Sequence, residues 1–356
     1  DGVLTRLKTR ICIAGHRGNV TRGIHYHEVF SPSPVQHTER LLQAMMVNYH
    51  LHNLAWDVKL AYTWAPLPKG ERVAVVYPDG FKQTNSEGKE LFLVLERNLY
   101  GMPSAGRGWG KHRDAFILKH FNAPGWSCSQ CTHDPCLFVI DKLIGPKGEN
   151  PPPENPSLSI ELPAGVSRSW VLIHTDDCDA YGTDLDVLHE INDAMNKEWK
   201  TEIVDRSYIL GVKRDLITDG PDGWRVTLSM TSFIEDLGGI FEEALEAKFG
   251  KRRVRTPFPE GLILTKAIEP EPGEVNRNIT RGYQRLVGSL LWCVRHVAPI
   301  AVYGMAQLCK LMATPTDLAW EAALHLLKYL LQHKSRGIVF SETTEDPFAF
   351  VDASNK

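Results

Sequence analysis

The sequence lacks an uninterrupted apolar run of the roughly 18 residues that a membrane-spanning helix needs. Its seven cysteines are an odd number without the spacing of a disulfide framework, which argues against a disulfide-rich secreted scaffold and favours a reducing compartment. Positive charge is not in excess either, since the formal net charge is −3, so a nucleic-acid partner would have to be bound by local basic patches. The chain starts at Asp1 without a signal-peptide pattern, and we expect it to be a segment of a longer protein.

The composition is that of an ordinary globular protein, with 43% hydrophobic and 23% charged residues. At 356 residues the chain is too long for one core, so two or three subdomains are expected. Proline and glycine gather in residues 66–90 and again in residues 141–169. We expect the first to be a looped hairpin and the second to be a flexible insertion between two strands.

Hydrophobic periodicity predicts the remaining elements. Helices are expected over residues 35–53, with Thr38 as cap and Leu41 starting the apolar face, and over residues 185–199. Another is expected over residues 231–248, capped by Thr231 or Ser232, followed by a separate helical unit at residues 281–333. Strands are expected at residues 9–15, 54–62, 73–77, 91–95, 137–140, 170–173, 207–212, 224–228, 337–340 and 348–352.

Two adjacent acids, Asp176 and Asp177, follow the apolar strand at residues 170–173. Like charges at the end of a buried strand repel each other, and a cation would remove that cost. Carboxylate oxygens are the usual ligands of Mg²⁺, so a hairpin that presents both acids is a candidate metal site. The alternative is a surface turn in which two acids face water.

A third acid, Asp57, interrupts the apolar strand at residues 54–62. A buried carboxylate needs a partner, either a metal or Lys59, which strand alternation places on the same face. If this strand lies beside the one that carries Asp176 and Asp177, three carboxylates converge. That arrangement suits two-metal phosphoryl or nucleotidyl transfer.

Basic and glycine-rich segments accompany the acids. Lys8 and Arg10 lie in a basic strand that would suit a triphosphate, with a solvated basic hairpin as the alternative. Residues 99–109 form a small-residue loop that opens a helix running to about residue 120, a weak phosphate-binding pattern. Residues 248–255 carry the densest positive run, which fits either a phosphate backbone or a solvated linker.

A zinc-like spacing occurs at Cys128, Cys131, His133 and Cys136. Four ligands are available, but they crowd into nine residues, and Cys136 leads into an apolar strand in which it reads as a core residue. The sequence leaves the choice between a zinc site and core cysteines open.

Taken in order, these segments resemble the reverse transcriptases of copia-type LTR retrotransposons over nearly the whole chain. The motifs that carry the resemblance are residues 8–15, 57–62, 77–81, 99–109, 134–138, 174–177, 210–211, 256–257, 283–291, 322–330 and 352–354. The acid pair, preceded by His174 and Thr175, stands where the family has Tyr-Val-Asp-Asp. No single motif is specific, but their order and spacing are.

The resemblance implies an α+β fold with the palm, fingers and thumb of a right-hand polymerase and an antiparallel palm sheet. Residues 1–227 would be fingers and palm with an insertion at 141–169, and residues 228–255 the thumb. Residues 256–340 would be a linker and helical connection, and residues 341–356 the start of a truncated ribonuclease H domain. Ribonuclease H activity is not expected, because Asp352 alone represents its carboxylates.

The resemblance also implies an RNA-directed DNA polymerase that uses an RNA template, a DNA primer or RNA–DNA hybrid, and dNTPs. Asp57 and Asp176 would bind two Mg²⁺ ions, with Mn²⁺ as the alternative metal and Asp177 as the weaker ligand. Further implied roles are a steric gate against the ribose 2′-hydroxyl for Tyr62, triphosphate contacts for Lys8 and Arg10, and a template or dNTP contact for Arg107.

The expected location is the cytoplasm, in a virus-like particle, with a nuclear phase also open; the oligomeric state is not implied.

A second reading is a degenerate remnant that binds nucleic acid without catalysis. A third is a metal-dependent phosphohydrolase, but no His or Glu motif accompanies the acids as a water-activating base.

Overall fold

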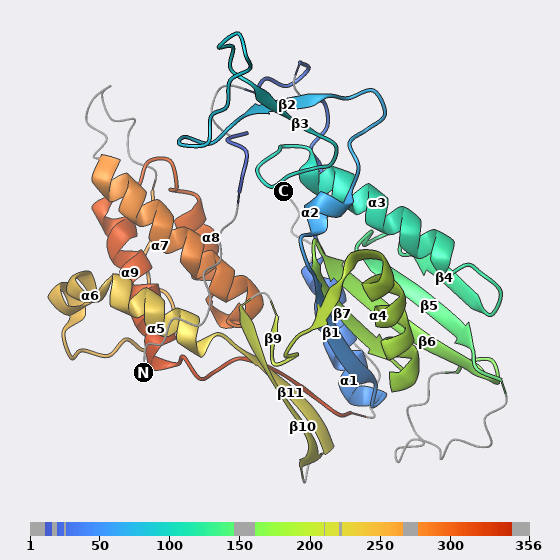
Figure 1. Cartoon of the computed structure of the whole chain (residues 1–356). Helices are drawn as coiled ribbons and strands as arrows, with labels where there is room; N and C mark the ends of the chain where they lie inside the picture. The colour runs from blue at the N-terminus through green and yellow to red at the C-terminus, as the bar shows by residue number, and fades with distance from the viewer. Residues whose placement is uncertain are drawn as a thin grey trace, which may run out of the picture. The chain divides into compact units, whose positions relative to one another are not determined.

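The computed structural model describes residues 11–15, 20–24, 26–145, 161–209, 211–220, 223–265 and 277–343. The chain divides into two compact units, Asp1–Asp205 and Arg206–Lys356, shown in Figure 1. Helices and antiparallel sheets make up both units, so the predicted α+β class with an antiparallel sheet is confirmed.

A six-stranded antiparallel sheet forms the centre of the first unit, in the order β4-β5-β6-β7-β1-β8. Its strands are β1 (His52–Val58), β4 (Trp126–Gln130), β5 (Leu137–Leu143), β6 (Val166–His174), β7 (Asp177–Gly182) and β8 (Thr201–Ile203). The strand that carries Asp57 therefore lies beside the strand that begins at Asp177, as the converging acids required.

Helices α3 (Ala105–His120) and α4 (Leu185–Trp199) lie across one face of this sheet, as Figure 1 shows. They bury the inward positions of the strands in a core that includes Trp56, Val58, Trp109, Phe138, Ile173, Cys178, Leu188 and Trp199. Helix α1 (Gln36–Asn48) bonds to the other face, because the amide of Gln43 donates to the hydroxyl of Tyr181 at 2.6 Å. Alternation along β7 places Asp177, Asp179 and Tyr181 on that face, away from the main core.

The short helix α2 (Ala61–Trp64) follows β1, and the hairpin of β2 (Val73–Val76) and β3 (Phe92–Leu95) follows α2. The first strand of this hairpin lies within residues 66–90, where a hairpin was expected. Its second strand is the one expected at residues 91–95.

The second unit combines a four-stranded antiparallel sheet, in the order β12-β11-β10-β9, with a group of helices. Its strands are β9 (Tyr208–Ile209), β10 (Val212–Gly220), β11 (Gly223–Ser229) and β12 (Ile338–Ser341). Its helices are α5 (Thr231–Ile240), α6 (Glu242–Phe249), α7 (Arg277–His296), the 3₁₀ helix η1 (Pro299–Ala301), α8 (Val302–Cys309) and α9 (Asp317–Gln332). Leucines and alanines on one side of α9 pack into the core of this unit.

Several local predictions are wrong. Residues 11–15 form no strand, and the helix expected over residues 231–248 is two helices separated at Phe241. Thr38 was expected to cap α1, but the residue before that helix is Val35. Thr231 or Ser232 was expected to cap α5, but the residue before it is Met230, and neither Val35 nor Met230 makes a side-chain capping bond. Leu41 is exposed rather than part of the apolar face of α1.

The boundary between the compact units also differs from the predicted end of the palm at residue 227. The hairpin of β10 and β11 lies in the second unit, where β12 pairs with β11 along residues 338–341. The strand at residues 337–340 therefore completes this sheet, which the sequence did not indicate. The strand expected at residues 348–352, Asp352 included, lies outside the described residues.

Candidate active site

A row of ionisable side chains crosses four neighbouring strands of the first unit. Asp57 in β1 is directly opposite Asp177 in β7 on one side and Glu202 in β8 on the other. His174 in β6 is opposite Asp177. Directly opposed residues of an antiparallel pair point to the same face, with Cβ atoms about 5 Å apart. His174, Asp177, Asp57 and Glu202 therefore line one side of the sheet.

The turn between β6 and β7 presents the third acid, Asp176. Because His174 and Asp177 are paired, Thr175 and Asp176 form a two-residue connection. Thr175 has a φ of 60°, an uncommon conformation for a β-branched residue. The backbone amide of Val58 donates to the carbonyl of Asp176 at 2.9 Å, which holds the turn against the end of β1.

Two residues of α3 hold the turn from the core side. The indole N–H of Trp109 donates to the carbonyl oxygen of Thr175 at 2.6 Å, and Nη1 of Arg113 donates to the same oxygen at 3.3 Å. Trp109 and Arg113 are 1% and 3% exposed, so both bonds lie away from bulk water. The backbone that carries the acid pair is thus fixed from β1 and from α3.

The neighbouring acids raise the proton affinity of Asp177. Asp177 has a raised pKa, first because it is partly withdrawn from water and then because Asp176 and Asp57 are negatively charged; the charge of His174 lowers it. A cation bound between the carboxylates would oppose all three raising effects.

The donors suit Mg²⁺ in kind, since hard divalent cations take carboxylate oxygens. Among the described residues, however, no three acidic, histidine or cysteine side chains are already grouped closely enough to hold a metal ion. The strands bring Asp57, Asp176 and Asp177 together where the end of β1 meets the start of β7. Their assignment as metal ligands therefore stays a prediction.

Lys59, the alternative partner for Asp57, forms an ion pair with Glu202, their Nζ and Oε2 atoms lying 2.8 Å apart. Both side chains are well exposed, so this pair stabilises the fold little. It does partly neutralise the end of the acidic row at β8.

Tyr62 lies in α2, four residues after Val58, the last residue of β1. Its ring packs against that of Tyr100, with centroids 4.9 Å apart, and a Cβ atom at Gly106 would lie 4.0 Å from the Tyr62 hydroxyl oxygen. The small-residue loop and the proposed steric gate are therefore neighbours.

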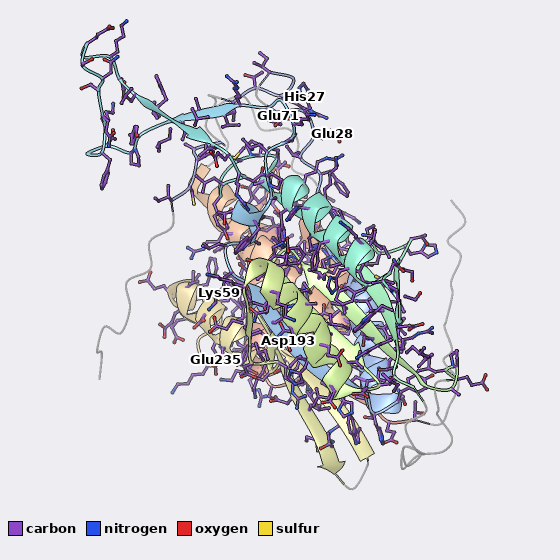
Figure 2. All side chains as sticks on the ribbon, turned by 45° about the vertical axis from the view of Figure 1, so that its right-hand side comes forward. His27, Glu28, Lys59, Glu71, Asp193 and Glu235 are labelled. Carbon is purple, nitrogen blue, oxygen red and sulfur yellow. The ribbon has the colours of Figure 1, made fainter. Side chains whose placement is uncertain are left out.

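Arg107, in the first turn of α3, forms an ion pair with Glu28 and donates to the carbonyl of Phe30 at 3.4 Å. Figure 2 labels Glu28 near the start of this helix. The guanidinium already has an anionic partner where the sequence predicted a template or dNTP contact. Lys8 and Arg10 lie outside the described residues, so their predicted triphosphate contact is not placed.

Two of the three cysteines of the zinc-like segment are core residues, while Cys131 is partly exposed. Cys128 and Cys136 are buried, and burial raises the pKa of the first thiol to about 11 and of the second to about 12. His133 is exposed, and the described residues contain no metal-ligand group at this segment.

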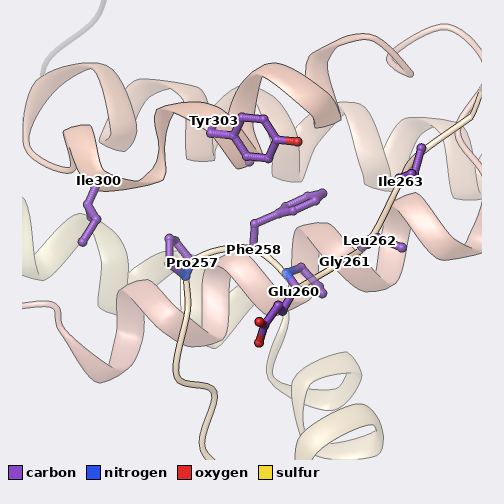
Figure 3. A pocket seen from close by; sticks show the side chains of 10 residues that line it. Pro257, Phe258, Glu260, Gly261, Leu262, Ile263, Ile300 and Tyr303 are labelled. Atoms are coloured by element: carbon purple, nitrogen blue, oxygen red, sulfur yellow. The ribbon is translucent and has the colours of Figure 1, made fainter.

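A cavity of about 480 Å³ occurs in the second unit (Figure 3). Its walls include Phe258 and Tyr303, whose rings are nearly perpendicular at a centroid distance of 6.0 Å. The lining is mainly apolar and contains none of the predicted site residues.

No helix in the described part of the chain is both long and apolar enough to cross a bilayer.

Sequence reasoning missed Glu202, Trp109 and Arg113. Glu202 could be recognised only from the strand register, which places it beside Asp57. Trp109 and Arg113 are four residues apart and so share a helix face, but nothing in the sequence shows that this face meets the turn at Thr175.

Comparison with known proteins gives a consistent result. Residues 1–125 match the family described as reverse transcriptase (RNA-dependent DNA polymerase); this range includes Asp57 but ends before the acid pair. The Pol polyprotein of tobacco (Nicotiana tabacum) transposon TNT 1-94 is 24% identical over 93% of this chain, which corresponds to 22% of the relative. That of Arabidopsis thaliana transposon RE2 is 25% identical over 99% of the chain and 21% of the relative.

The chain thus spans about a fifth of the length of these curated relatives. A third, the Pol polyprotein of the Arabidopsis transposon RE1, is 24% identical over 99% of the chain. Together with the order of motifs and the pairing of the acid-bearing strands, these matches confirm the resemblance of the chain to the reverse transcriptase region of copia-type retrotransposon Pol polyproteins.

Proposed function

We propose that the chain is an RNA-directed DNA polymerase of a retrotransposon, which adds dNTPs to the 3′-hydroxyl of a primer. The observation that carries the proposal is the direct pairing of Asp57 in β1 with Asp177 in β7, with Asp176 in the turn that leads from β6 into β7. The reverse transcriptase match over residues 1–125 supports the same reaction class.

In this proposal Asp57 and Asp176 hold two Mg²⁺ or Mn²⁺ ions, and Asp177 is a weaker ligand. Such ions, when bound, lower the pKa of the primer hydroxyl and stabilise charge on the leaving phosphate. The protein contributes position and charge: the sheet sets the carboxylates side by side, and α3 and β1 hold the turn.

The substrate contacts follow from the surroundings of the acids. The ring of Tyr62, supported by Tyr100, would exclude a ribose 2′-hydroxyl by its bulk. Arg107 would exchange its ion pair with Glu28 for the triphosphate or template, and Lys8 and Arg10 would add positive charge.

The template and primer need a positively charged surface, and the second unit supplies one. Lys251, Arg252, Arg253 and Arg255 are exposed, while Val254 between them is buried and bonded on both its amide and its carbonyl to the side chain of Gln332. The anchored backbone thus displays a row of cations suited to phosphates.

The domain assignment is part of the proposal. Residues 1–227 are fingers and palm, residues 228–255 the thumb, residues 256–340 a linker and helical connection, and residues 341–356 the start of a ribonuclease H-like domain. The protein acts in the cytoplasm in a virus-like particle, with a nuclear phase as the alternative.

Primer extension on poly(rA) with oligo(dT) and dTTP tests the function. We expect Mg²⁺-dependent DNA synthesis that falls to background in Asp57→Asn. Asp141→Asn is the matched control, since Asp141 lies in β5 of the same sheet and is bonded by Arg168 at 2.7 Å, outside the acidic row. Synthesis that persists in Asp57→Asn would contradict the metal assignment. Binding of the primer–template without synthesis would indicate a catalytically inactive binding module.

A further inference from the structure

We infer that Trp109 and Arg113 are positioning residues, which hold the Thr175–Asp176 turn so that the acid pair can bind a divalent cation together with Asp57. The inference rests on the proposed function and adds two residues of α3 to its site. Neither touches the carboxylates in the described hydrogen bonds; both act through the carbonyl of Thr175.

The turn needs external support, because its backbone is not the one its sequence prefers. Thr175 adopts a φ of 60°, which is costly for a β-branched residue. Asp57 and Asp177 also lie directly opposite each other in β1 and β7, so like charges repel across the place where the turn meets β1. Two buried donors on one carbonyl, together with the Val58 amide on the next, hold the turn in place.

Trp109 is itself rigidly held. Its ring meets that of Trp199 edge-on, with centroids 5.0 Å apart, and α3 fixes it from the backbone side. A donor whose position is set by packing fixes the acceptor more closely than a mobile one does.

Arg113 adds a positive charge on the core side of the turn. Asp114 Oδ1 accepts from its Nε at 2.9 Å and lies 2.7 Å from Nη2, which orients the guanidinium. Gln130 donates to the other oxygen of Asp114 at 3.2 Å, so the orientation is maintained by a second residue. The remaining Nη1 is thereby aimed at the Thr175 carbonyl.

Trp109→Phe removes the N–H and retains an aromatic ring against Trp199. The matched control is Trp199→Phe, which disturbs the same aromatic contact and removes a 3.4 Å hydrogen bond to Nε2 of His112, but leaves the turn alone. Binding of Mn²⁺ to the intact chain, measured by electron paramagnetic resonance titration, gives a readout that does not need catalysis. Thermal unfolding of each variant is recorded alongside.

The expected result is that Trp109→Phe weakens Mn²⁺ binding by about 3- to 10-fold, the effect of one lost hydrogen bond, while Trp199→Phe leaves it unchanged. In primer extension, kcat should fall and the metal dependence should shift to higher concentration, with KM for dTTP constant. Arg113→Lys keeps the positive charge but loses the paired N–H donors of the guanidinium, so it should weaken Mn²⁺ binding similarly. It replaces Trp109→Phe as the test if that variant does not fold.

Equal losses of Mn²⁺ affinity in Trp109→Phe and Trp199→Phe would overturn the inference, because they would reflect general packing. An unchanged affinity in both Trp109→Phe and Arg113→Lys would overturn it as well. A parent chain that neither binds Mn²⁺ nor extends a primer would instead refute the proposed function, and the inference with it.

Discussion

Asp57 and Asp177 face each other directly across β1 and β7, and Glu202 faces Asp57 from β8. Like charges directly opposite each other weaken an antiparallel sheet. An arrangement that reduces stability at the same place where the fold is otherwise well packed is typical of a functional site.

The first prediction concerns this repulsion. Asp177→Asn should raise the unfolding midpoint at pH 7 by about 1–2 °C, because it removes a carboxylate whose charge is disfavoured in the folded state. A raised pKa in the folded state means that the carboxyl costs nothing well below the usual pKa of Asp, and that it becomes increasingly destabilising as the pH rises from that usual value to the raised one. The advantage of Asn should therefore disappear near pH 3.

Thermal unfolding between pH 3 and pH 8 checks this. Asp141→Asn is the opposite case, since it loses the attractive contact with Arg168 and should lower the midpoint at neutral pH. Mg²⁺ should raise the midpoint of the parent more than that of Asp177→Asn. A midpoint difference for Asp177→Asn that does not change with pH would contradict the electrostatic account.

The second prediction concerns the backbone of the turn. Thr175→Asn should stabilise the chain by about 0.5–1 kcal/mol, because Asn adopts a φ near 60° more readily than a β-branched residue does. Thr175→Val keeps the branch and removes the hydroxyl, so it should give no gain. Chemical denaturation of the three chains measures the difference, and a gain in Thr175→Val equal to that in Thr175→Asn would rule out conformational strain as the reason.

The sequence predicted those elements whose periodicity is strong. Apolar residues at positions such as Leu188, Ile191 and Met195 predicted the helix over residues 185–199, and α4 has those limits. The apolar run around Trp56 likewise predicted β1 with Asp57 inside it. In both cases the local pattern and the tertiary burial agree.

Features that depend on distant partners could not be read in this way. The proximity of Glu202 to Asp57 follows from strand register, and the roles of Trp109 and Arg113 from a contact with a turn more than 60 residues away.

The break at Phe241 follows two consecutive glycines, where a Cβ at Gly238 would lie 2.7 Å from Leu331 in α9. Close packing of α5 on α9, which no local pattern encodes, thus requires a residue that weakens the helix.

The third prediction concerns the choice of sugar. Tyr62→Ala should increase incorporation of rUTP relative to dTTP by about tenfold or more, because the bulk that excludes the 2′-hydroxyl is removed. Tyr62→Phe retains the ring and its contact with Tyr100, so discrimination should stay as in the parent. Steady-state kcat/KM for each nucleotide on poly(rA) with oligo(dT) measures the ratio. Loss of discrimination in Tyr62→Phe would point to the hydroxyl rather than to ring volume.

The fourth prediction concerns the contact between Arg107 and Glu28. If the guanidinium binds the triphosphate, Glu28 competes with the substrate, and Glu28→Gln should lower KM for dTTP by about 2- to 3-fold with kcat unchanged. Arg107→Lys should raise KM, because a single ammonium cannot reproduce the paired donors of the guanidinium. Glu90→Gln is the control: it breaks an exposed ion pair with Lys82 in the neighbouring hairpin and should leave KM as in the parent. A higher KM in Glu28→Gln would mean that Glu28 supports Arg107 in its working position instead of competing for it.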